Sequence, residues 1–399
     1  MLKTMIIWIY FTAVASAMSF NNAVLEINKH QSLRSLNFES NALLSLGDRK
    51  GSWGDPVLRI MAKNFPKDSL DDDLTPMTGI EFGLAQKISL TTKHANINQA
   101  YTYASQSKQY ESSDKKQSLL KVLWGIVILS KKITKEIKIL TENINWISKT
   151  IQVSKNLYSN GKISQQALFE IQIRKSETQI KLNNKKSKIL ELQAQLNYLI
   201  GHDSLIEDKS IPWHLLTVKN VDVKDLKKMS LQENLKSKQS LLTASKLNYV
   251  PDVTVSIGYI KRSNIDDQGD FVSAGISFPL PFSSTKYSQS KEAIQNKNIA
   301  VSRLENYLLK KKKRTKRLQI NIQRINAELV VLKNKLIKFA ENSREITLKA
   351  YSLGRASYLE LLQSEMKLQE FLLKETNLVS ALALSKVDYK YLVGESLNE

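Results

Sequence analysis

The chain has 399 residues, a formal net charge of +21 and no cysteine. The lack of cysteine excludes disulfides, thiol chemistry and a lipid-modified N-terminal cysteine. The charge is of the size found in nucleic-acid-binding proteins, but the lysines are spread along extended segments and are not gathered beside aromatic residues, which favours a solvated, lysine-rich helical surface.

Residues 1–17 predict a cleavable signal peptide. Lys3 is the charged start, residues 5–14 form the apolar core, and Ala15-Ser16-Ala17 is a small-residue cleavage site. The apolar run is too short to span a bilayer as a helix; a buried N-terminal helix is the alternative. Export argues against nucleic acid as a partner. No later stretch approaches 18 consecutive apolar residues, so no transmembrane helix is expected.

A strand pair followed by a helical hairpin is predicted in the first half. Residues 58–62 and 80–85 alternate weakly between apolar and other residues, as strands with two different faces do. Residues 92–160 contain one glycine and no proline, and apolar residues recur there every three or four positions, which predicts a helix of about 100 Å that packs as a coiled coil. Gly161 is expected to end this helix and Ser164 to cap a return helix that ends near residue 199.

The same order of elements recurs in the second half with a stronger strand pattern. Residues 253–259 and 272–278 alternate apolar with small polar residues, residues 283–353 contain neither glycine nor proline, and a return helix is expected from Ser357 to about residue 392. Residues 158–201 and 351–394 align without a gap, with 12 of 44 positions identical. We therefore predict two structural repeats, 18–210 (strand pair about 55–90, helical hairpin about 91–200) and 211–399 (strand pair about 251–281, helical hairpin about 284–393).

The two faces of the predicted strands indicate where they lie. One face carries Val, Ile, Tyr and Phe, and the other carries Ser, Thr and Gly. This alternation is typical of transmembrane β-barrel strands. A two-sheet sandwich is the alternative, but four strands are too few for one, and four strands cannot close a barrel either. Other copies of the chain would have to complete the barrel, because open edges do not occur in a membrane.

The repeat, the Tyr-Ser-x-Gly tips at 158–161 and 351–354, and the strand motif at 274–281 resemble the TolC-like outer-membrane efflux channels over essentially the whole mature chain. The resemblance implies an α+β membrane channel, in which long α-helical hairpins form a periplasmic coiled-coil barrel. It also implies a homotrimer whose protomers each give four strands to a twelve-stranded transmembrane β-barrel. The expected location is the bacterial outer membrane, with contact to its lipid and an extension into the periplasm, and no cofactor is expected.

A narrower resemblance is carried by Gly54-Asp55-Pro56, Lys63-Asn64-Phe65-Pro66 and residues 77–86, which are similar to the branch that serves cation- and heavy-metal-exporting pumps. It implies a periplasmic adaptor (membrane fusion) protein and an inner-membrane, proton-driven RND-type pump as partners. Drug efflux and type I protein secretion are the competing branches. Many pump-linked members carry a lipid-anchored N-terminal cysteine and an acidic lining, whereas this chain has no cysteine and is strongly basic.

Candidate pore residues follow from the same resemblance. Some family members place a ring of Asp six residues after the second tip glycine and another three residues later, which here are Glu360 and Gln363; the first-half equivalents are Ala167 and Glu170. We hypothesise that Glu360 contributes a gate ring, since a pore needs a polar or charged constriction. A solvated Glu on an amphipathic helix is the alternative.

The hairpin tips are candidates for docking the adaptor, beside their role in reversing the chain. The candidate residues are Tyr158, Gly161, Lys162, Ser164, Tyr351, Gly354, Arg355 and Ser357.

No catalytic set is present in the sequence. The four His show no metal-ligand spacing, and there is no phosphate-binding Gly-rich loop or Gly-x-Ser-x-Gly motif. We therefore expect no enzyme activity and no metal site. A basic, exported helical scaffold is the alternative from a different class; it would be soluble without detergent.

Overall fold

The computed structural model describes residues 16–217, 223–263, 269–280 and 282–398. Most of the predicted signal peptide and the acidic pair Asp266-Asp267 therefore lie outside the described residues. The chain forms two compact units. The hairpin unit contains the residues up to Arg34, Asp114–Asp225 and the residues from Lys310 on, and the sheet unit contains Ser35–Ser113 and Leu226–Leu309. Each unit thus combines segments from both halves of the sequence.

The order of elements repeats between the halves. The first half runs α2 (Gln31–Gly51), β2 (Val57–Lys63), β3 (Gly79–Ile88), α3 (Lys93–Ser159) and α4 (Gln165–Ile200). The second runs α5 (Leu226–Leu247), β5 (Val253–Lys261), β6 (Phe271–Ser277), α6 (Ser284–Val331), a π turn at Leu332–Leu336, α7 (Ile337–Ser352) and α8 (Tyr358–Val393). Both strand pairs and both helical hairpins were predicted. The helices α2 and α5, which precede the strand pairs, were not.

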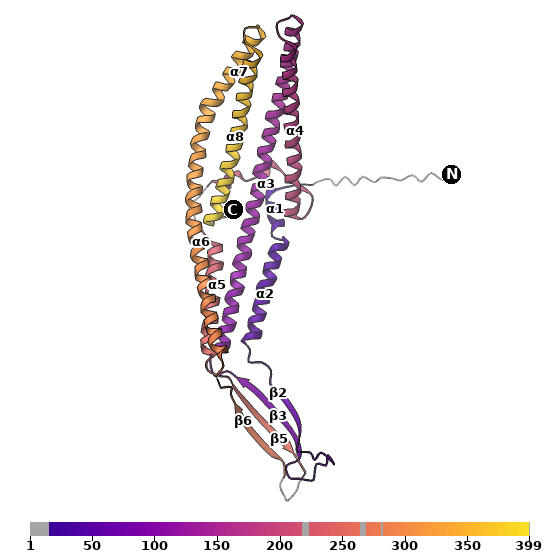
Figure 1. Ribbon diagram of the computed structural model, residues 1–399, viewed down its shortest axis with the longest axis vertical. Helices are drawn as coiled ribbons and strands as arrows, with labels where there is room; N and C mark the ends of the chain where they lie inside the picture. Colours follow the sequence, from indigo (N-terminus) through magenta and orange to yellow (C-terminus); the bar gives the residue numbers. More distant parts are fainter. Residues whose placement is uncertain (1–15, 218–222, 264–268, 281, 399) are drawn as a thin grey trace, which may run out of the picture. The chain divides into compact units, whose positions relative to one another are not determined.

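One four-stranded antiparallel sheet in the order β2-β3-β5-β6 forms the end of the sheet unit (Figure 1). The β3–β5 pairing, which joins the two halves, is the longest ladder and runs from Ile80 opposite Lys261 to Ile88 opposite Val253. The register aligns the alternation of all four strands. One face carries Leu58, Ile60, Ile80, Phe82, Leu84, Val255, Ile257, Tyr259, Val272 and Ile276, all exposed. The predicted two-faced strands are confirmed.

The helices of the sheet unit approach closely because small residues face one another. The hydroxyls of Ser40 (α2) and Ser105 (α3) are 2.7 Å apart, and Ser107 (α3) donates to the backbone carbonyl of Ser230 (α5) at 2.8 Å. A Cβ added to Gly47 would lie only 2.8 Å from the Cβ of Tyr101. Small side chains therefore set the spacing of these helices.

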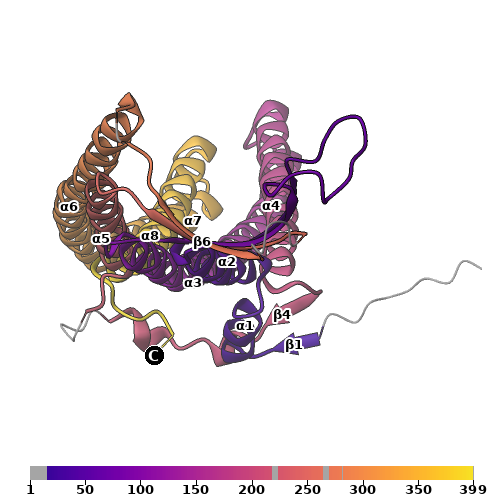
Figure 2. The same ribbon diagram turned by 90° about the horizontal axis from the view of Figure 1, so that it is seen from below.

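The main apolar core of the hairpin unit surrounds Trp124. Its ring packs on Phe20 of α1 (Phe20–Ile27) at 4.8 Å between centroids and on Trp213 at 5.8 Å, and its indole N–H donates to the carbonyl of Leu397 at 2.8 Å. A short parallel ladder, β1 (Ser16–Met18) with β4 (Ser204–Ile206), lies beside α1 (Figure 2). The N-terminal residues, a mid-chain segment and the C-terminus are thereby held on α3.

Among the described residues, no helix combines the length and apolar character needed to cross a membrane.

Candidate functional site at the hairpin tips

Both hairpin tips close by the same backbone motif. Gly161 and Gly354 adopt the left-handed conformation, with φ of +68° and +72°. At the first tip the N–H of Lys162 donates to the carbonyl of Leu157 at 2.8 Å, and at the second the N–H of Arg355 donates to the carbonyl of Ala350 at 2.8 Å. This is the Schellman ending of a helix, and glycine is required because other residues are strained at positive φ. The predicted helix ends are confirmed.

The return helices begin at the predicted serines. The hydroxyl of Ser164 accepts from the N–H of Ala167 at 3.3 Å, and that of Ser357 accepts from the N–H of Glu360 at 3.2 Å. Only the second tip completes a capping box, because the carboxylate of Glu360 accepts from the N–H of Ser357 at 2.7 Å and from its hydroxyl at 2.9 Å. These hydrogen bonds hold the pKa of Glu360 below its ordinary value, so its exposed carboxylate stays charged.

The other two pore candidates are also exposed. Gln363 lies one turn after Glu360 on the same helix, and Glu170 lies on α4. Tyr358, the first residue of α8, is buried, and its hydroxyl has no hydrogen-bond partner among the described residues. Burial raises the pKa of Tyr358 to about 12, with a further contribution from the negative charge of Glu170. The carboxylate of Glu170 therefore lies near the N-terminal turn of α8.

The two tips lie against each other. The Cδ of Lys162 is 4.0 Å from the position that a Cβ on Gly354 would take. Lys162 and Arg355 are both exposed, while the paired tyrosines differ: Tyr158 is 43% exposed and Tyr351 is 1% exposed. The structure therefore brings two cationic side chains to one end of the hairpin pair, on a rigid turn.

A small apolar core lies directly behind the tips. It contains Ile147 and Leu157 of α3, Ile171 of α4, Tyr351 of α7, and Tyr358 and Leu361 of α8. The hydroxyls of Tyr351 and Ser154, both buried, are 2.8 Å apart and link α7 to α3. Residues of both hairpins are thus packed into one cluster, which fixes the position of one tip against the other.

A buried polar network lies further along the same four helices. The side-chain amide of Asn143 (α3) donates to the carboxylate of Glu365 (α8) at 2.6 Å, and Gln369 (α8) donates to Asn143 at 3.3 Å. Arg174 (α4) donates to Gln369 at 3.2 Å, and Arg344 (α7) lies 3.5 Å from the carboxylate of Glu365. Burial raises the pKa of Glu365 despite these partners. Polar groups buried in this way specify one register between packed helices.

Sequence reasoning missed Tyr358 and this network. Tyr358, Leu361, Glu365 and Leu368 are spaced by three, four and three residues, which is the seam spacing of a coiled coil, and all four are buried. The signal available in the sequence for this network was Glu365, a glutamate at a position of the coiled-coil seam. Its partners Asn143, Arg174 and Arg344 come from three other helices and left no local pattern.

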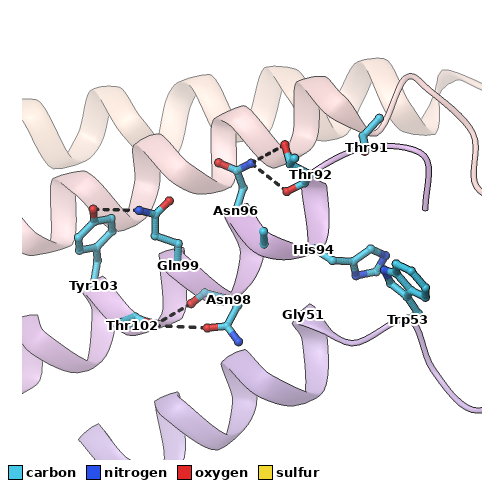
Figure 3. A pocket seen from close by; sticks show the side chains of 11 residues that line it. Gly51, Trp53, Thr91, Thr92, His94, Asn96, Asn98, Gln99, Thr102 and Tyr103 are labelled. Carbon is cyan, nitrogen blue, oxygen red and sulfur yellow. Dashed lines mark hydrogen bonds between the residues drawn. The ribbon is translucent and has the colours of Figure 1, made fainter. Parts of the chain in front are cut away.

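One further cavity lies in the sheet unit. Figure 3 shows a pocket of about 910 Å³ in the sheet unit, lined by Gly51, Trp53 and residues of α3. Several of its polar side chains bond to residues on or next to α3, as in the pairs Asn96–Thr92, Gln99–Tyr103 and Thr102–Asn98, and Asn98 also donates to Asp48 of α2 at 3.0 Å. In the part of the chain that the structure describes, no group of three or more His, Asp or Glu is placed to hold a metal ion.

The fold defined by these elements is that of the TolC-like outer-membrane channels, a class of channel proteins and not of enzymes. The crystal structure of the outer membrane protein VceC from Vibrio cholerae matches with a TM-score of 0.78 and 14% identity, over 94% of this chain and 96% of that one. A crystal structure of CusC, reported with its folding and transmembrane channel formation, matches with a TM-score of 0.80 and 11% identity, over 96% of this chain and 93% of that one.

The open state of the MtrE outer membrane channel of Neisseria gonorrhoeae matches with a TM-score of 0.75 and 10% identity, over 94% and 89%. No family model matches the sequence, and no curated protein matches it significantly. At 10–14% identity the likeness establishes the fold and not the cargo or the partners.

Proposed function

We propose that this chain is the outer-membrane exit duct of a tripartite efflux system, through which an inner-membrane pump and a periplasmic adaptor export their cargo. The observation that carries the proposal is the sheet β2-β3-β5-β6. One face carries exposed apolar side chains on every strand, with Gln86 and Lys261 at its margins, and the other face is dominated by small and polar residues. A sheet with these faces suits lipid on one side and an aqueous lumen on the other.

The sheet also requires partners. Among the described residues, its edge strands β2 and β6 each pair on one side only. Unpaired backbone groups are costly in a membrane, so the edges must be joined to other strands. Three copies would give a twelve-stranded barrel, as the family resemblance implies, with β6 of one copy beside β2 of the next.

The helices of the hairpin unit also expose apolar side chains that indicate a partner. On α7, Phe339 and Ile346 are 67% and 70% exposed and are seven residues apart. On α4, Phe169, Ile173 and Ile180 are 51%, 58% and 61% exposed. Exposed apolar side chains at coiled-coil spacing indicate a helix partner. We propose that α7 of one protomer packs on α4 of the next, a head-to-tail contact that closes a homotrimeric ring.

The proposed location is the outer membrane, in contact with its lipid and extending into the periplasm. The signal peptide predicted for residues 1–17 would direct export, and its cleavage would leave Met18, the last residue of β1, near the mature N-terminus. Nucleic acid has no place among the proposed partners.

The cargo expected from the resemblance near the N-terminus is a cation or heavy metal, delivered by a proton-driven RND-type pump. Drug export and type I protein secretion are the other two candidates. The adaptor would dock on the hairpin tips, where Lys162 and Arg355 are exposed beside the tip glycines.

A strain lacking the protein tests the duct, its cargo and the docking together. We expect sensitivity to divalent cations, or to dyes and antibiotics in the drug-export case, and recovery with the wild-type gene. Lys162→Asp with Arg355→Asp should fail to restore resistance although the protein reaches the membrane, because opposite charges at the tips would repel the adaptor. Lys186→Asp with Lys338→Asp, exposed residues of the same hairpins away from the tips, is the control. Full resistance with the tip variant would overturn docking, and an unchanged susceptibility of the deletion strain would overturn the duct.

Glu360 is proposed to form a ring of three carboxylates at the hairpin tips. Its role in the capping box is separable from its charge, because glutamine also serves at this capping position. In single-channel recordings, Glu360→Gln should reduce cation preference while the helix cap is kept. Ser357→Ala, which breaks the cap and keeps the carboxylate, should leave selectivity near that of the wild type. Equal selectivity in Glu360→Gln and wild type would leave Glu360 with a capping role alone.

A further inference from the structure

The polar face of the sheet carries more cations than anions. By register, its charged residues are Arg59 and Lys63 on β2, and Glu81 and Lys87 on β3. Lys63 and Glu81 form an ion pair at 2.6 Å. Of the two remaining cations, Lys87 is paired with Asp252, which precedes β5, and Arg59 is left among the described residues as the unpaired positive charge of this face.

Arg59 stands apart on this face. Its neighbours in the row across the sheet are Gly83 on β3, Gly258 on β5 and Ser273 on β6. The residues of that row carry no long side chain, although the carboxylate of Glu81 reaches over its two glycines. The side chain of Arg59 is exposed. Within the described ranges, Arg59 forms no ion pair, whereas Lys87 lies 3.3 Å from the carboxylate of Asp252. The guanidinium of Arg59 therefore carries an unpaired charge in a row whose other residues are glycine and serine.

The nearby carboxylate of Glu81 does not cancel the positive charge of Arg59. The Oε1 atom of Glu81 lies over the glycines, 2.9 Å from the position of a Cβ on Gly258, and its other oxygen binds Lys63. The acidic residues of the loop after β2 begin with Asp68. That loop starts five residues beyond Arg59, about 16 Å along an extended strand, which exceeds the screening length of about 8 Å at physiological salt.

We infer that Arg59 forms a cationic ring in the lumen of the β-barrel and makes this duct favour anions at its outer end. The inference rests on the proposed function, because the polar face becomes a lumen only when copies of the sheet close into a barrel. Three copies would place three guanidinium groups around one aqueous passage, and rings of Arg or Lys are what anion and phosphate pores use. Arg keeps its charge at every physiological pH.

The consequence concerns the cargo. Free divalent cations would meet a repulsive lining on leaving the duct, whereas anionic or neutral small molecules would not. The wall of the barrel thus disfavours bare metal ions among the three candidate cargoes. It also gives part of the strong basic charge of the chain a role in permeation.

Reversal potentials in a KCl gradient across a planar bilayer test the inference on the full-length protein. Arg59→Ser should lower the chloride-to-potassium permeability ratio by roughly twofold, which is below the effects of narrow charged clefts because a twelve-stranded lumen is wide. Arg59→Lys keeps the charge and should keep the ratio. Lys67→Ser removes one charge from the exposed loop after β2 and is the matched control.

Each outcome decides between the claims. A lower ratio in Arg59→Ser alone supports the ring. Channels of unchanged ratio in Arg59→Ser, or an equal change in Lys67→Ser, overturn it while the duct stands. Wild-type protein that inserts and conducts no ions would overturn the duct itself and the ring with it.

Discussion

Phe339→Glu combined with Ile346→Glu is expected to leave the protein monomeric and unable to conduct. Both side chains are about two-thirds exposed in the single chain and lie seven residues apart on α7. If they meet the apolar residues of α4 in a neighbouring copy, the substitution buries two carboxylates without partners. Unpaired buried charges cost several kcal/mol each, and a cyclic trimer would suffer the cost at three contacts.

Light scattering of the detergent-solubilised protein measures this result directly. Asn334→Glu with Lys338→Gln changes the net charge by the same two units on the same helical path, about 80° or more around the helix from the apolar residues. The control should remain trimeric. A trimer in the Glu-substituted variant would contradict packing of α7 between copies, and the barrel would then have to be closed by the strands alone.

Trp124→Ala is expected to cause the largest loss of stability of any single substitution in the described core. The side chain is fully buried and packs between Phe20 and Trp213, and its indole N–H satisfies the carbonyl of Leu397. Removal of a buried tryptophan costs about 3–5 kcal/mol through lost burial and the cavity left behind. The carbonyl of Leu397 would also lose its donor.

Denaturant unfolding of the full-length protein, followed by circular dichroism, measures the loss. Trp124→Phe keeps an aromatic ring and should cost clearly less, with the difference reflecting volume and the hydrogen bond. Because Trp124 joins α1, the mid-chain segment and the C-terminus, the alanine variant should also increase proteolysis at both ends of the chain. Wild-type stability in the alanine variant would contradict this assignment of the core.

The hairpin tips carry two kinds of constraint, and different experiments separate them. The Tyr351–Ser154 bond and the apolar cluster fix the tips relative to each other within one chain. The charges at Glu360, Lys162 and Arg355 are exposed and remain available to other molecules. Substitutions of the first kind should therefore affect stability and resting conductance, and substitutions of the second kind should affect selectivity and docking.

The amino-acid sequence by itself determined the parts of this protein that depend on neighbours along the chain. Gly161 and Gly354 must occupy left-handed positions, Ser164 and Ser357 can cap a helix locally, and an alternating strand exposes two faces whatever it pairs with. These features depend on contacts within about four residues. The periodicity of apolar residues and the positions of the glycines and serines were therefore enough to predict the hairpins, the tips and the strands.

Only the tertiary structure decided which elements meet. The pairing of β3 with β5, the burial of Glu365 among Asn143, Arg174 and Arg344, and the contact of Tyr351 with Ser154 join residues that are 150 or more positions apart or lie on different helices. The isolation of Arg59 is likewise a property of the register, because its row is completed by glycines and a serine from three other strands. Such contacts depend on long-range packing and pairing, which leave no fixed spacing in the sequence.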